Sequence, residues 1–418
     1  MRKEAEIKND YQSAKARYKA YGVDTDKAME TLKKLALSVH CWQGDDVNGL
    51  ESDGALTGGI MATGNYMGKA RNGDELRADI DKAFALIPGT KKLNLHAMYA
   101  EFDGKHANRD EIGVEHFAKW LGWAKKNGYG MDFNPTFFSH EMFKDNMTLT
   151  HPDKEVRQFW IEHCKRTREI GAEFGKQLGQ TCVNDIWIAD GMKDTPADRM
   201  TYRARLKDAL DEIFEPKFDQ NHLVDAVESK LFGIGSESFV PGSFEFYLAY
   251  AVENDVALCL DSGHYHPTET ISDKISSALL FIDKILLHVS RGVRWDSDHV
   301  VALTDDTQAI ARECVKSGMD RIFYGLDFFD ASINRIAAWV IGSRAFLKAM
   351  LIALLEMPAI LKAEENFDYT TRFALTEEQR QLPWGAVWDE YCRQCGVPAG
   401  FDWLDDVRAY EADVLSKR

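Results

Sequence analysis

Leu223-Val-Asp-Ala-Val-Glu228 is a short, mostly apolar and β-branched run that ends in a carboxylate. A stretch with helical spacing of apolar residues follows over residues 243–254, and then a second run, Ala257-Leu-Cys-Leu-Asp261. Short apolar runs bounded by polar residues are typical of buried strands. Strands that alternate with helices need crossover connections, so this region predicts a parallel sheet covered by helices.

The same unit repeats along the chain. Eight strands are predicted, over residues 35–42, 93–99, 131–135, 186–190, 223–228, 257–261, 285–290 and 322–327. Helices are predicted over residues 74–86, 110–126, 154–178, 197–214, 243–254, 270–282, 305–317 and 331–355. Eight such units favour an α/β fold of the closed (β/α)8 type, a TIM barrel, over an open doubly wound sheet.

An open sheet would need a Gly-rich turn after its first strand. The run Gly64-Asn-Tyr-Met-Gly68-Lys69-Ala70 has three residues between its glycines where a phosphate loop has four, and it lacks the magnesium-binding Ser or Thr. The turn Gly233-Ile-Gly235 lacks the third glycine of a dinucleotide-binding turn. Both runs therefore read as ordinary loops.

The chain is predicted to be a single domain over residues 1–418, with the barrel at about residues 35–355. Residues 1–34 are helical in pattern and charged, and residues 356–418 have a helical pattern with many aromatic side chains. Neither segment has strands of its own. We expect both to be extensions that pack on the barrel or between subunits.

Charge and hydropathy exclude several classes of protein. The 418 residues include 51 basic and 67 acidic side chains, a net charge of −16, which disfavours binding to nucleic acid. Residues 1–10 contain no apolar stretch of the kind found in secretory signals. The apolar segment 336–360 is interrupted by Arg344, Lys348 and Glu356 and predicts a buried helix instead of a membrane span.

Cysteine usage points to the cytoplasm. Seven cysteines, an odd number, are spread over a long chain, which is typical of reduced thiols. Cys392 and Cys395 form one CxxC pair, but no second pair or histidine cluster follows at zinc-site spacing. We interpret that pair as incidental.

Candidate site residues lie where the last four predicted strands end. In a closed parallel barrel the active site is built at the carboxyl ends of the strands. The residues at these ends are Glu228, Asp261, His288 and Asp327. Close to them in sequence are Lys230, His264, Asp296 and Asp298. Residues two apart in an extended chain point the same way, so Asp296 and Asp298 can share an ion, and Glu228 and Lys230 can face one cavity.

The charges in this set predict bound metal. Five carboxylates crowded together repel one another unless they are protonated or neutralised, and two divalent cations together with Lys230 would balance them. Oxygen-rich ligands with a minority of imidazoles suit manganese, magnesium or cobalt. None of the seven cysteines belongs to this set. Taken singly, a strand-end Asp can be a helix cap and a buried His can be a core residue.

Several long motifs resemble the bacterial L-rhamnose isomerases, and the similarity runs over essentially the whole chain. The motifs are His40-Cys-Trp-Gln-Gly-Asp-Asp46, Leu56-Thr-Gly-Gly59 with Ala62-Thr-Gly-Asn-Tyr66, Asp225-Ala-Val-Glu-Ser-Lys-Leu-Phe-Gly-Ile-Gly235, Gly263-His-Tyr-His-Pro-Thr-Glu269, Arg294-Trp-Asp-Ser-Asp-His299 and Gly325-Leu-Asp-Phe-Phe-Asp-Ala-Ser-Ile-Asn-Arg335.

The resemblance implies a manganese-dependent aldose-ketose isomerase with a xylose-isomerase-like barrel, cytoplasmic and homotetrameric. It would convert L-rhamnose to L-rhamnulose in rhamnose catabolism and accept related aldoses. By the same resemblance, one metal site matches Glu228, Asp261, His288 and Asp327, and the second matches His264, Asp296 and Asp298, with Asp261 as a candidate bridge. Zn²⁺, Co²⁺ or Mg²⁺ are alternatives to Mn²⁺ at one of the two.

Two chemical routes move a sugar carbonyl from C1 to C2. A base can remove the C2 proton to give an enediol, or a metal can polarise the carbonyl so that hydride shifts directly. The ligand set favours the hydride shift. Lys230 is the candidate cation near O1, and Asp298 and Asp327 complete the predicted catalytic group.

Other residues are candidates for contact with the sugar. His96, near the end of the second strand, could exchange a proton with the ring oxygen or simply bond a hydroxyl. Trp42 and Trp187 could pack against the apolar face of the sugar or belong to the barrel core. His264 could also contact substrate, and His266 is expected to orient a ligand or the substrate.

Two other readings stay open from the residues alone. A one-metal sugar epimerase or a phosphoester hydrolase could use a similar barrel, although phosphate chemistry would favour Arg clusters or a phosphate loop beside the ions. A sugar-sensing protein without catalysis could also retain the fold. The complete set of ligand-type residues on four strand ends disfavours this last reading.

Overall fold

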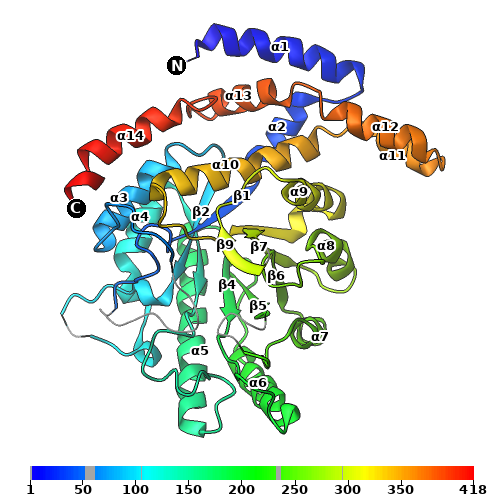
Figure 1. Cartoon of the computed structure of the whole chain (residues 1–418). Coiled ribbons are helices and arrows are strands. Elements are labelled where there is room, and N and C mark those ends of the chain that lie inside the picture. Colours follow the sequence, from blue (N-terminus) through cyan, green and yellow to red (C-terminus); the bar gives the residue numbers. More distant parts are fainter. Residues whose placement is uncertain (1, 52–61, 105, 232–236, 294) are drawn as a thin grey trace.

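The computed structural model describes residues 2–51, 62–104, 106–231, 237–293 and 295–418. Its centre is a closed barrel of parallel strands in the order β1-β10-β7-β6-β5-β4-β3-β2 (Figure 1). The predicted (β/α)8 fold is confirmed. The predicted motif Leu56-Thr-Gly-Gly59, the turn Gly233-Ile-Gly235 and Arg294 lie outside the described residues.

The strands of the barrel are short. They are β1 (Ala36–His40), β2 (Thr90–His96), β3 (Gly130–Asn134), β4 (Cys182–Trp187), β5 (Leu223–Glu228), β6 (Ala257–Asp261), β7 (Ile285–Val289) and β10 (Ile322–Leu326). A two-stranded antiparallel hairpin, β8 (Arg291–Val293) and β9 (Trp295–His299), follows β7. All eight predicted strands overlap a strand of the barrel.

Helices surround the barrel and cover one end of it. Those that follow strands are α3 (Gly73–Phe84), α4 (Ala118–Asn127), α5 (Lys154–Leu178), α6 (Arg199–Phe214), α7 (Phe244–Asn254), α8 (Ser272–Leu279), α9 (Asp305–Ser317) and α10 (Arg335–Leu354). The terminal helices are α1 (Glu4–Ala20), α2 (Thr25–Lys33), α11 (Pro358–Glu365), α12 (Tyr369–Gln379), α13 (Trp384–Gln394) and α14 (Trp403–Asp413).

Several predicted boundaries differ from the structure by a few residues, and β2 is shifted by three residues at both ends; two of the differences have a cause in the sequence. Strand β4 begins at Cys182, four residues before the predicted start, because the polar pair Asn184 and Asp185 is paired within the sheet. The predicted helix over 110–126 is interrupted, since Ile112 and Gly113 are extended and divide it into 3-10 turns and α4.

Alternation along the strands separates the inside of the barrel from its helical shell. Val224 and Ala226 of β5, Ala257 and Cys259 of β6, and Leu286 of β7 belong to one small buried cluster, distinct from the main core. Successive side chains of a strand point to opposite faces, so Glu228, Asp261 and His288 face the same interior one step further along. The apolar cluster is therefore the floor of the site.

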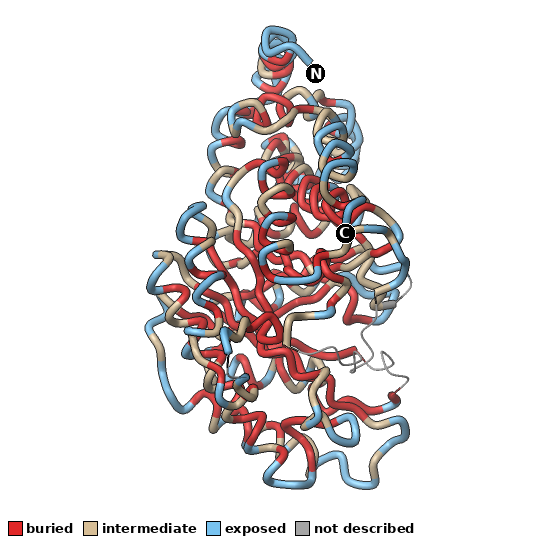
Figure 2. The backbone as a smooth tube through the Cα atoms, turned by 90° about the vertical axis from the view of Figure 1, so that its left-hand side faces the viewer, coloured by how far each residue is buried: buried red, intermediate tan, exposed pale blue. Residues whose placement is uncertain are grey.

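The terminal segments pack together above the barrel. Helix α1 lies against α13, and α2 contacts both α10 and α13, so the beginning and end of the chain are joined (Figure 1). The buried faces of these helices are continuous with the core (Figure 2). Helices α11 and α12 form an arm that projects from the side of the molecule (Figure 1).

Helix α10 is long and apolar enough to cross a membrane by length and composition alone. In the structure, 83% of its most apolar window is buried inside the molecule. It packs against α9, α2 and α3. This burial agrees with the prediction that the segment is a buried helix.

Arg335, the first residue of α10, anchors the loop that follows β1. Its guanidinium donates to both carboxylate oxygens of Asp46 at 2.7 and 2.8 Å. It also donates to the backbone oxygens of Tyr66 and Met67 at 2.7 and 3.0 Å. Arg335 is 3% exposed, so these bonds are largely shielded from water. They tie two separate parts of the loop to one helix terminus.

We expect Arg335→Ala to lower the free energy of unfolding by about 3 kcal/mol, because it leaves a carboxylate and two carbonyls without their donor. Urea unfolding followed by tryptophan fluorescence measures the change. Arg312→Ala is the control, since Arg312 pairs with Glu356 at 3.5 Å on the surface and should cost at most about 0.5 kcal/mol. Equal effects of the two substitutions would contradict the assignment.

Candidate metal centre

The carboxyl ends of the last four barrel strands bring the predicted ligands together. Glu228 and Asp261 end β5 and β6, His288 is the next-to-last residue of β7, and Asp327 directly follows β10. Asp261 pairs with His288 in register across β6 and β7. Glu228, Asp261 and His288 are each at most 3% exposed.

The two histidines lie between the carboxylates. Nδ1 of His264 is 3.1 Å from one oxygen of Glu228, and Nδ1 of His288 is 3.1 Å from the other. His264 also approaches Asp296 through Nε2, at 3.1 Å. Ligand atoms of Glu228, Asp261 and His264 lie within 4.8 Å of one another, as do those of Asp261, His288 and Asp327. Asp261 belongs to both groups.

Several of these atoms are buried without a hydrogen-bond partner in the described structure. They are Nδ1 of His264 and of His288, Oδ2 of Asp261 and Oδ1 of Asp296. The 3.1 Å approaches to Glu228 therefore do not have hydrogen-bond geometry. Buried polar atoms are normally satisfied, and donor atoms that converge without bonding one another are what a metal site provides. The residues present fit divalent cations.

Without ions, three of these carboxyl groups have a raised pKa and hold protons more readily, whereas the charge of His288 lowers the pKa of Glu228 although burial opposes it. Burial and the charges of Glu228 and Asp296 raise the pKa of Asp261 to about 7. Burial and Asp296 raise the pKa of Asp298 well above its usual range, and burial and Asp261 do the same for Asp327. Although burial opposes it, the charge of Glu228 raises the pKa of His288. Cations at this position would replace these protons.

Asp296 and Asp298 reach the cluster from the hairpin of β8 and β9. Asp298 has φ +41°, a conformation that costs energy for any residue except glycine. Its backbone carbonyl accepts a hydrogen bond from the amide of Phe329 at 3.1 Å, which ties the hairpin to the segment after β10. Asp296, Asp298 and the intervening Ser297 all line one cavity, so the two carboxylates reach the same space although the backbone of Asp298 departs from extended geometry.

A cavity of about 300 Å³ opens beside the cluster. Its lining includes the predicted sugar-contacting residues His96, Trp42 and Trp187 together with Glu228, His264, His288, Asp296, Asp298 and Asp327. Trp42 and Trp187 are 7% and 8% exposed, and the indole N–H of each lacks a partner in the described structure. The two rings therefore present both an apolar face and a donor to a ligand.

His96 lies on the opposite wall of the barrel from the acidic cluster. Its ring is 4.3 Å from that of Trp42, and its Nδ1 is 3.2 Å from the hydroxyl of Thr136. Burial and the nearby positive charge of His288 lower the pKa of His96 to about 3. The imidazole is therefore neutral at physiological pH and can either donate or accept a proton.

Lys230 differs from its expected position. Its ammonium donates to the backbone oxygen of Ala189 and to Glu237, both at 2.7 Å, and Lys230 is absent from the residues that line the cavity. The strand ends at Glu228, so the alternation used to place Lys230 does not extend to it. His266 also differs from expectation, because it lies exposed on the loop after β6.

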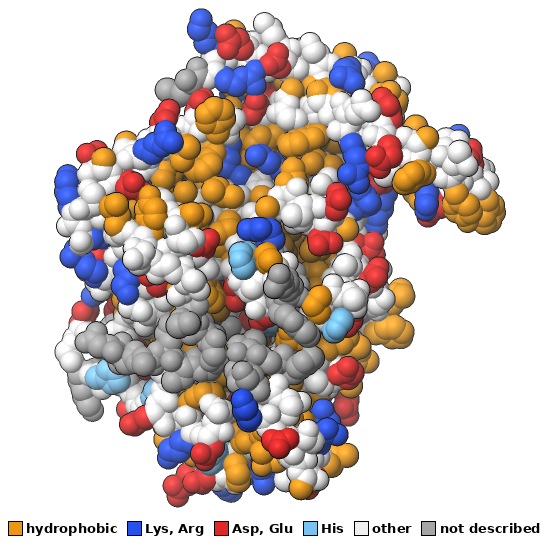
Figure 3. All heavy atoms as spheres, viewed as in Figure 1, with side chains coloured by type: hydrophobic (Ala, Val, Ile, Leu, Met, Phe, Trp, Pro, Cys, Tyr) orange, Lys and Arg blue, Asp and Glu red, His pale blue; other side chains and the backbone are white. Residues whose placement is uncertain are grey.

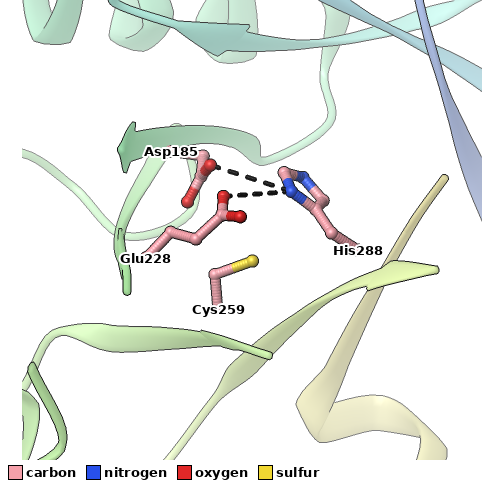
Figure 4. Close-up of side chains that lie close together, drawn as sticks. All are labelled: Asp185, Glu228, Cys259 and His288. Atoms are coloured by element: carbon pink, nitrogen blue, oxygen red, sulfur yellow. Dashed lines mark ion pairs between the residues drawn. The ribbon is translucent and has the colours of Figure 1, made fainter. Parts of the chain in front are cut away.

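Two residues of the cluster, Asp185 and Cys259, were not predicted from the sequence. Both lie beside Glu228 and His288, and the ligand atoms of all four are within 4.8 Å of one another (Figure 4). The predicted strand-end set contains no cysteine, whereas the sulfur of Cys259 lies within this distance of Glu228 and His288. Each residue lies two positions before a residue that was singled out, Trp187 and Asp261, so alternation along the strand was the signal that could have found it.

Comparison with known families shows which family the chain belongs to. The family model described as L-rhamnose isomerase (RhaA) matches residues 5–418. The chain belongs to the L-rhamnose isomerase family. Relatives from Salmonella paratyphi A and Salmonella typhimurium, both named L-rhamnose isomerase, are each 58% identical to it over 99% of both chains. This member of the L-rhamnose isomerase family is therefore an isomerase that acts on a small sugar.

The solved structures that resemble this chain are more distant. A structure described as L-ribulose 3-epimerase matches 76% of this chain and 95% of its own, with 14% identity and a TM-score of 0.46. A structure described as D-psicose 3-epimerase with D-fructose matches 63% of this chain and 86% of its own, with 14% identity and a TM-score of 0.40.

We expect Mn²⁺ to stabilise this isomerase more strongly as the pH rises. Between about pH 4, where unfolded carboxyl groups titrate, and about pH 7, where Asp261 titrates, the ion-free native state binds more protons than the unfolded state. Its stability therefore falls with rising pH in this window, and the raised pKa of His288 acts in the same direction. Bound cations remove that penalty.

Thermal unfolding with Mn²⁺ and with EDTA, at about pH 5.5 and about pH 7.5, measures this difference. The gap between the two melting temperatures should be wider at the higher pH. Mg²⁺-buffered EDTA serves as a control for non-specific effects of the chelator. A melting temperature that does not respond to chelator at the higher pH would contradict a metal centre.

Proposed function

We propose that this isomerase interconverts L-rhamnose and L-rhamnulose, accepts related aldoses, and depends on two divalent cations, with Mn²⁺ as the preferred ion. The observation that carries the proposal is the convergence on one cavity of buried carboxylates and of two imidazoles whose Nδ1 atoms lack a hydrogen bond. Membership of the family and relatives named for L-rhamnose support the substrate. Oxygen ligands outnumber nitrogen ligands, which supports Mn²⁺, with Co²⁺, Mg²⁺ or Zn²⁺ able to replace it at one position.

We assign the ligands to two overlapping groups. Glu228, Asp261, His288 and Asp327 would hold one ion, and His264, Asp296 and Asp298 the other, with Asp261 between them. The shared place of Asp261 in two groups of converging atoms supports the bridge. Cations bound here supply Lewis-acid polarisation of adjacent sugar oxygens.

The remaining cavity residues bind and orient the sugar in this proposal. Trp42 and Trp187 pack against its apolar face and methyl group. His96 is neutral, so its free ring nitrogen can move a proton to or from the ring oxygen during ring opening. His264 contributes to substrate contact at the edge of the cavity.

We retain Lys230 as a catalytic candidate with a modified role. Its charge is paired with Glu237, and its ammonium lies 5.9 Å from the centre of the Trp187 ring. In this position the positive charge of Lys230 acts on the sugar at a distance, and its contact with Trp187 holds that ring in place. Lys230→Arg should therefore preserve more activity than Lys230→Met.

We also propose a homotetramer located in the cytoplasm. Hydrophobic side chains gather on the arm of α11 and α12 (Figure 3), where Leu361, Phe367, Tyr369 and Phe373 are between 47% and 78% exposed. Exposed apolar groups of this size are typical of subunit contacts. All seven cysteines are free, which supports a reducing compartment.

An assay of L-rhamnose with Mn²⁺ tests the function, with the ketose read by colour. EDTA should abolish the reaction and Mn²⁺ should restore it. Asp298→Asn should lower turnover by about a hundredfold or more, because a ligand charge is lost. Asn tolerates positive φ, so the backbone at this position is preserved. Asp283→Asn is the control, since its carboxylate is 66% exposed and remote from the cavity.

Two results would contradict this proposal. Normal turnover of the Asp298→Asn variant at the wild-type Mn²⁺ concentration would remove Asp298 from the ligands. Absence of any ketose from L-rhamnose, with turnover of another aldose in the same panel, would remove L-rhamnose as the substrate.

The cavity lining supports a direct hydride shift over an enediol. Its carboxylates are Glu228, Asp296, Asp298 and Asp327, and all four belong to the assigned ligand set. Among the described lining residues, therefore, no carboxylate is left over to serve as a base at carbon. His96 is assigned to the ring oxygen.

Isomerisation in D₂O tests the route. A hydride shift transfers hydrogen between C2 and C1 without exchange, so the ketose formed in a single turnover should carry almost no deuterium at C1. Mass spectrometry or proton NMR of the product measures it. Metal-stripped protein incubated with ketose in D₂O provides the background. Near-complete incorporation would establish proton abstraction and an enediol instead.

A further inference from the structure

Cys259 lies inside the barrel, one step below the strand-end ligands. It precedes Asp261 by two residues on β6, which places it about 7 Å deeper along the strand on the same inner face. It is fully buried and pairs in register with Glu228 of β5. Figure 4 shows its sulfur directed toward Glu228 and His288, with Asp185 on the far side of the same space.

The atoms around this space are poorly satisfied. Oδ1 of Asp185 and Nδ1 of His288 have no hydrogen-bond partner within the described ranges of the chain. Asp185 is 1% exposed and His288 is 3% exposed, so water cannot reach them freely from outside. The other oxygen of Asp185 is 3.9 Å from Nδ1 of His288 and 3.4 Å from the amide of Asn134. Two buried polar atoms of the group are therefore left without a hydrogen bond, although His288 is paired with Glu228 at 3.1 Å.

The chemistry of the four donors differs from that of the strand-end sites. A sulfur, an imidazole nitrogen and two carboxylates have ligand atoms within 4.8 Å of one another. Four mixed ligands that include a thiolate suit cations with affinity for sulfur, such as Zn²⁺ or Cd²⁺, and not Mn²⁺ or Mg²⁺. Binding would release the thiol proton of Cys259 to the solvent, since the thiolate is the ligand.

We propose that Asp185, Glu228, Cys259 and His288 form an additional cation position, below the strand-end sites, that is selective for thiophilic divalent ions. Glu228 and His288 are also assigned to the strand-end ion. A cation at the lower position takes these two ligands from the upper one, so the two occupancies exclude each other. The lower position therefore makes the isomerase sensitive to thiophilic metals.

Titration of the metal-stripped full-length protein with Cd²⁺ tests the site directly. Coordination by Cys259 should produce a thiolate-to-cadmium charge-transfer band in the ultraviolet that saturates at one equivalent. Cys259→Ser, a near-isosteric change, should abolish it. A band of unchanged size in the Cys259→Ser protein would overturn the proposal.

Two other cysteine variants make the comparison specific. Cys182→Ser is the matched control, because Cys182 is equally buried in the same sheet but its sulfur lies against Gly171 of α5, outside the barrel. It should keep the band. Cys395→Ser tests the CxxC pair, since Cys395 is the one cysteine that is partly exposed. A band that disappears with Cys395→Ser and persists with Cys259→Ser would place the ion at the surface pair and overturn the proposal.

A second variant covers the case in which Cys259→Ser does not fold, as judged by circular dichroism. Asp185→Asn leaves the thiol in place and removes one ligand charge. It should raise the Cd²⁺ concentration at half-saturation by about tenfold or more. An unchanged titration of this variant would overturn the four-ligand site.

Inhibition of the Mn²⁺-loaded enzyme tests the competition, and this part rests on the proposed isomerase activity. Cd²⁺ should inhibit the wild type, excess Mn²⁺ should relieve the inhibition, and Cys259→Ser should need about tenfold more Cd²⁺ for the same effect. Equal inhibition of both proteins would overturn the exclusion. Failure of the proposed function would appear differently, as no ketose from the Mn²⁺-loaded wild type, while the absorption titration would still report on the site.

Discussion

The burial of many like charges at one end of a barrel is the constraint on which this molecule depends. Six carboxylates meet there, from Asp185, Glu228, Asp261, Asp296, Asp298 and Asp327, with only two imidazoles between them. Each ionised carboxylate in such a place costs several kcal/mol unless a positive charge compensates it. The shifted pKa values of Asp261, Asp298 and Asp327 express this cost in the ion-free protein. Divalent cations bound here would offset this cost.

The surrounding structure supplies the rigidity that holds these groups together. Closure of the sheet leaves each ligand-bearing strand paired on both sides, so the strand ends cannot separate. Arg335 fixes the long loop after β1 to the start of α10. The strained backbone of Asp298 is tolerated because Phe329 binds its carbonyl and the hairpin has a defined place over the cavity.

Overlap between ligand groups has consequences for ion selectivity. Glu228 and His288 belong both to the oxygen-rich strand-end set and to the deeper set that contains Cys259. In the proposed arrangement, ions of different chemical preference would compete for the same two side chains, because the sulfur of Cys259 lies within 4.8 Å of their ligand atoms.

Much of the fold and the strand-end ligands could be predicted from the sequence. The repeated strand and helix pattern determined the barrel, because a run such as 257–261 can bury both of its faces only in a parallel sheet covered by helices. Glu228, Asp261 and Asp327 could be named because each stands where its apolar run stops. Long motifs that resemble one family indicated the class of reaction, because they contain the strand-end carboxylates and histidines together with their spacing.

Only the tertiary structure decided which of the other side chains join the site. Asp185 and Cys259 lie inside their strands and not at the carboxyl ends, so only the pairing of β4 with β5, β5 with β6 and β6 with β7 places them beside Glu228 and His288. Lys230 lies beyond the end of its strand, where alternation no longer applies. Its ammonium is directed instead by hydrogen bonds to Glu237 and to the backbone oxygen of Ala189. The periodicity of a sequence determines which face of a strand a side chain occupies. Which side chains of different strands and loops meet is decided only when the barrel closes.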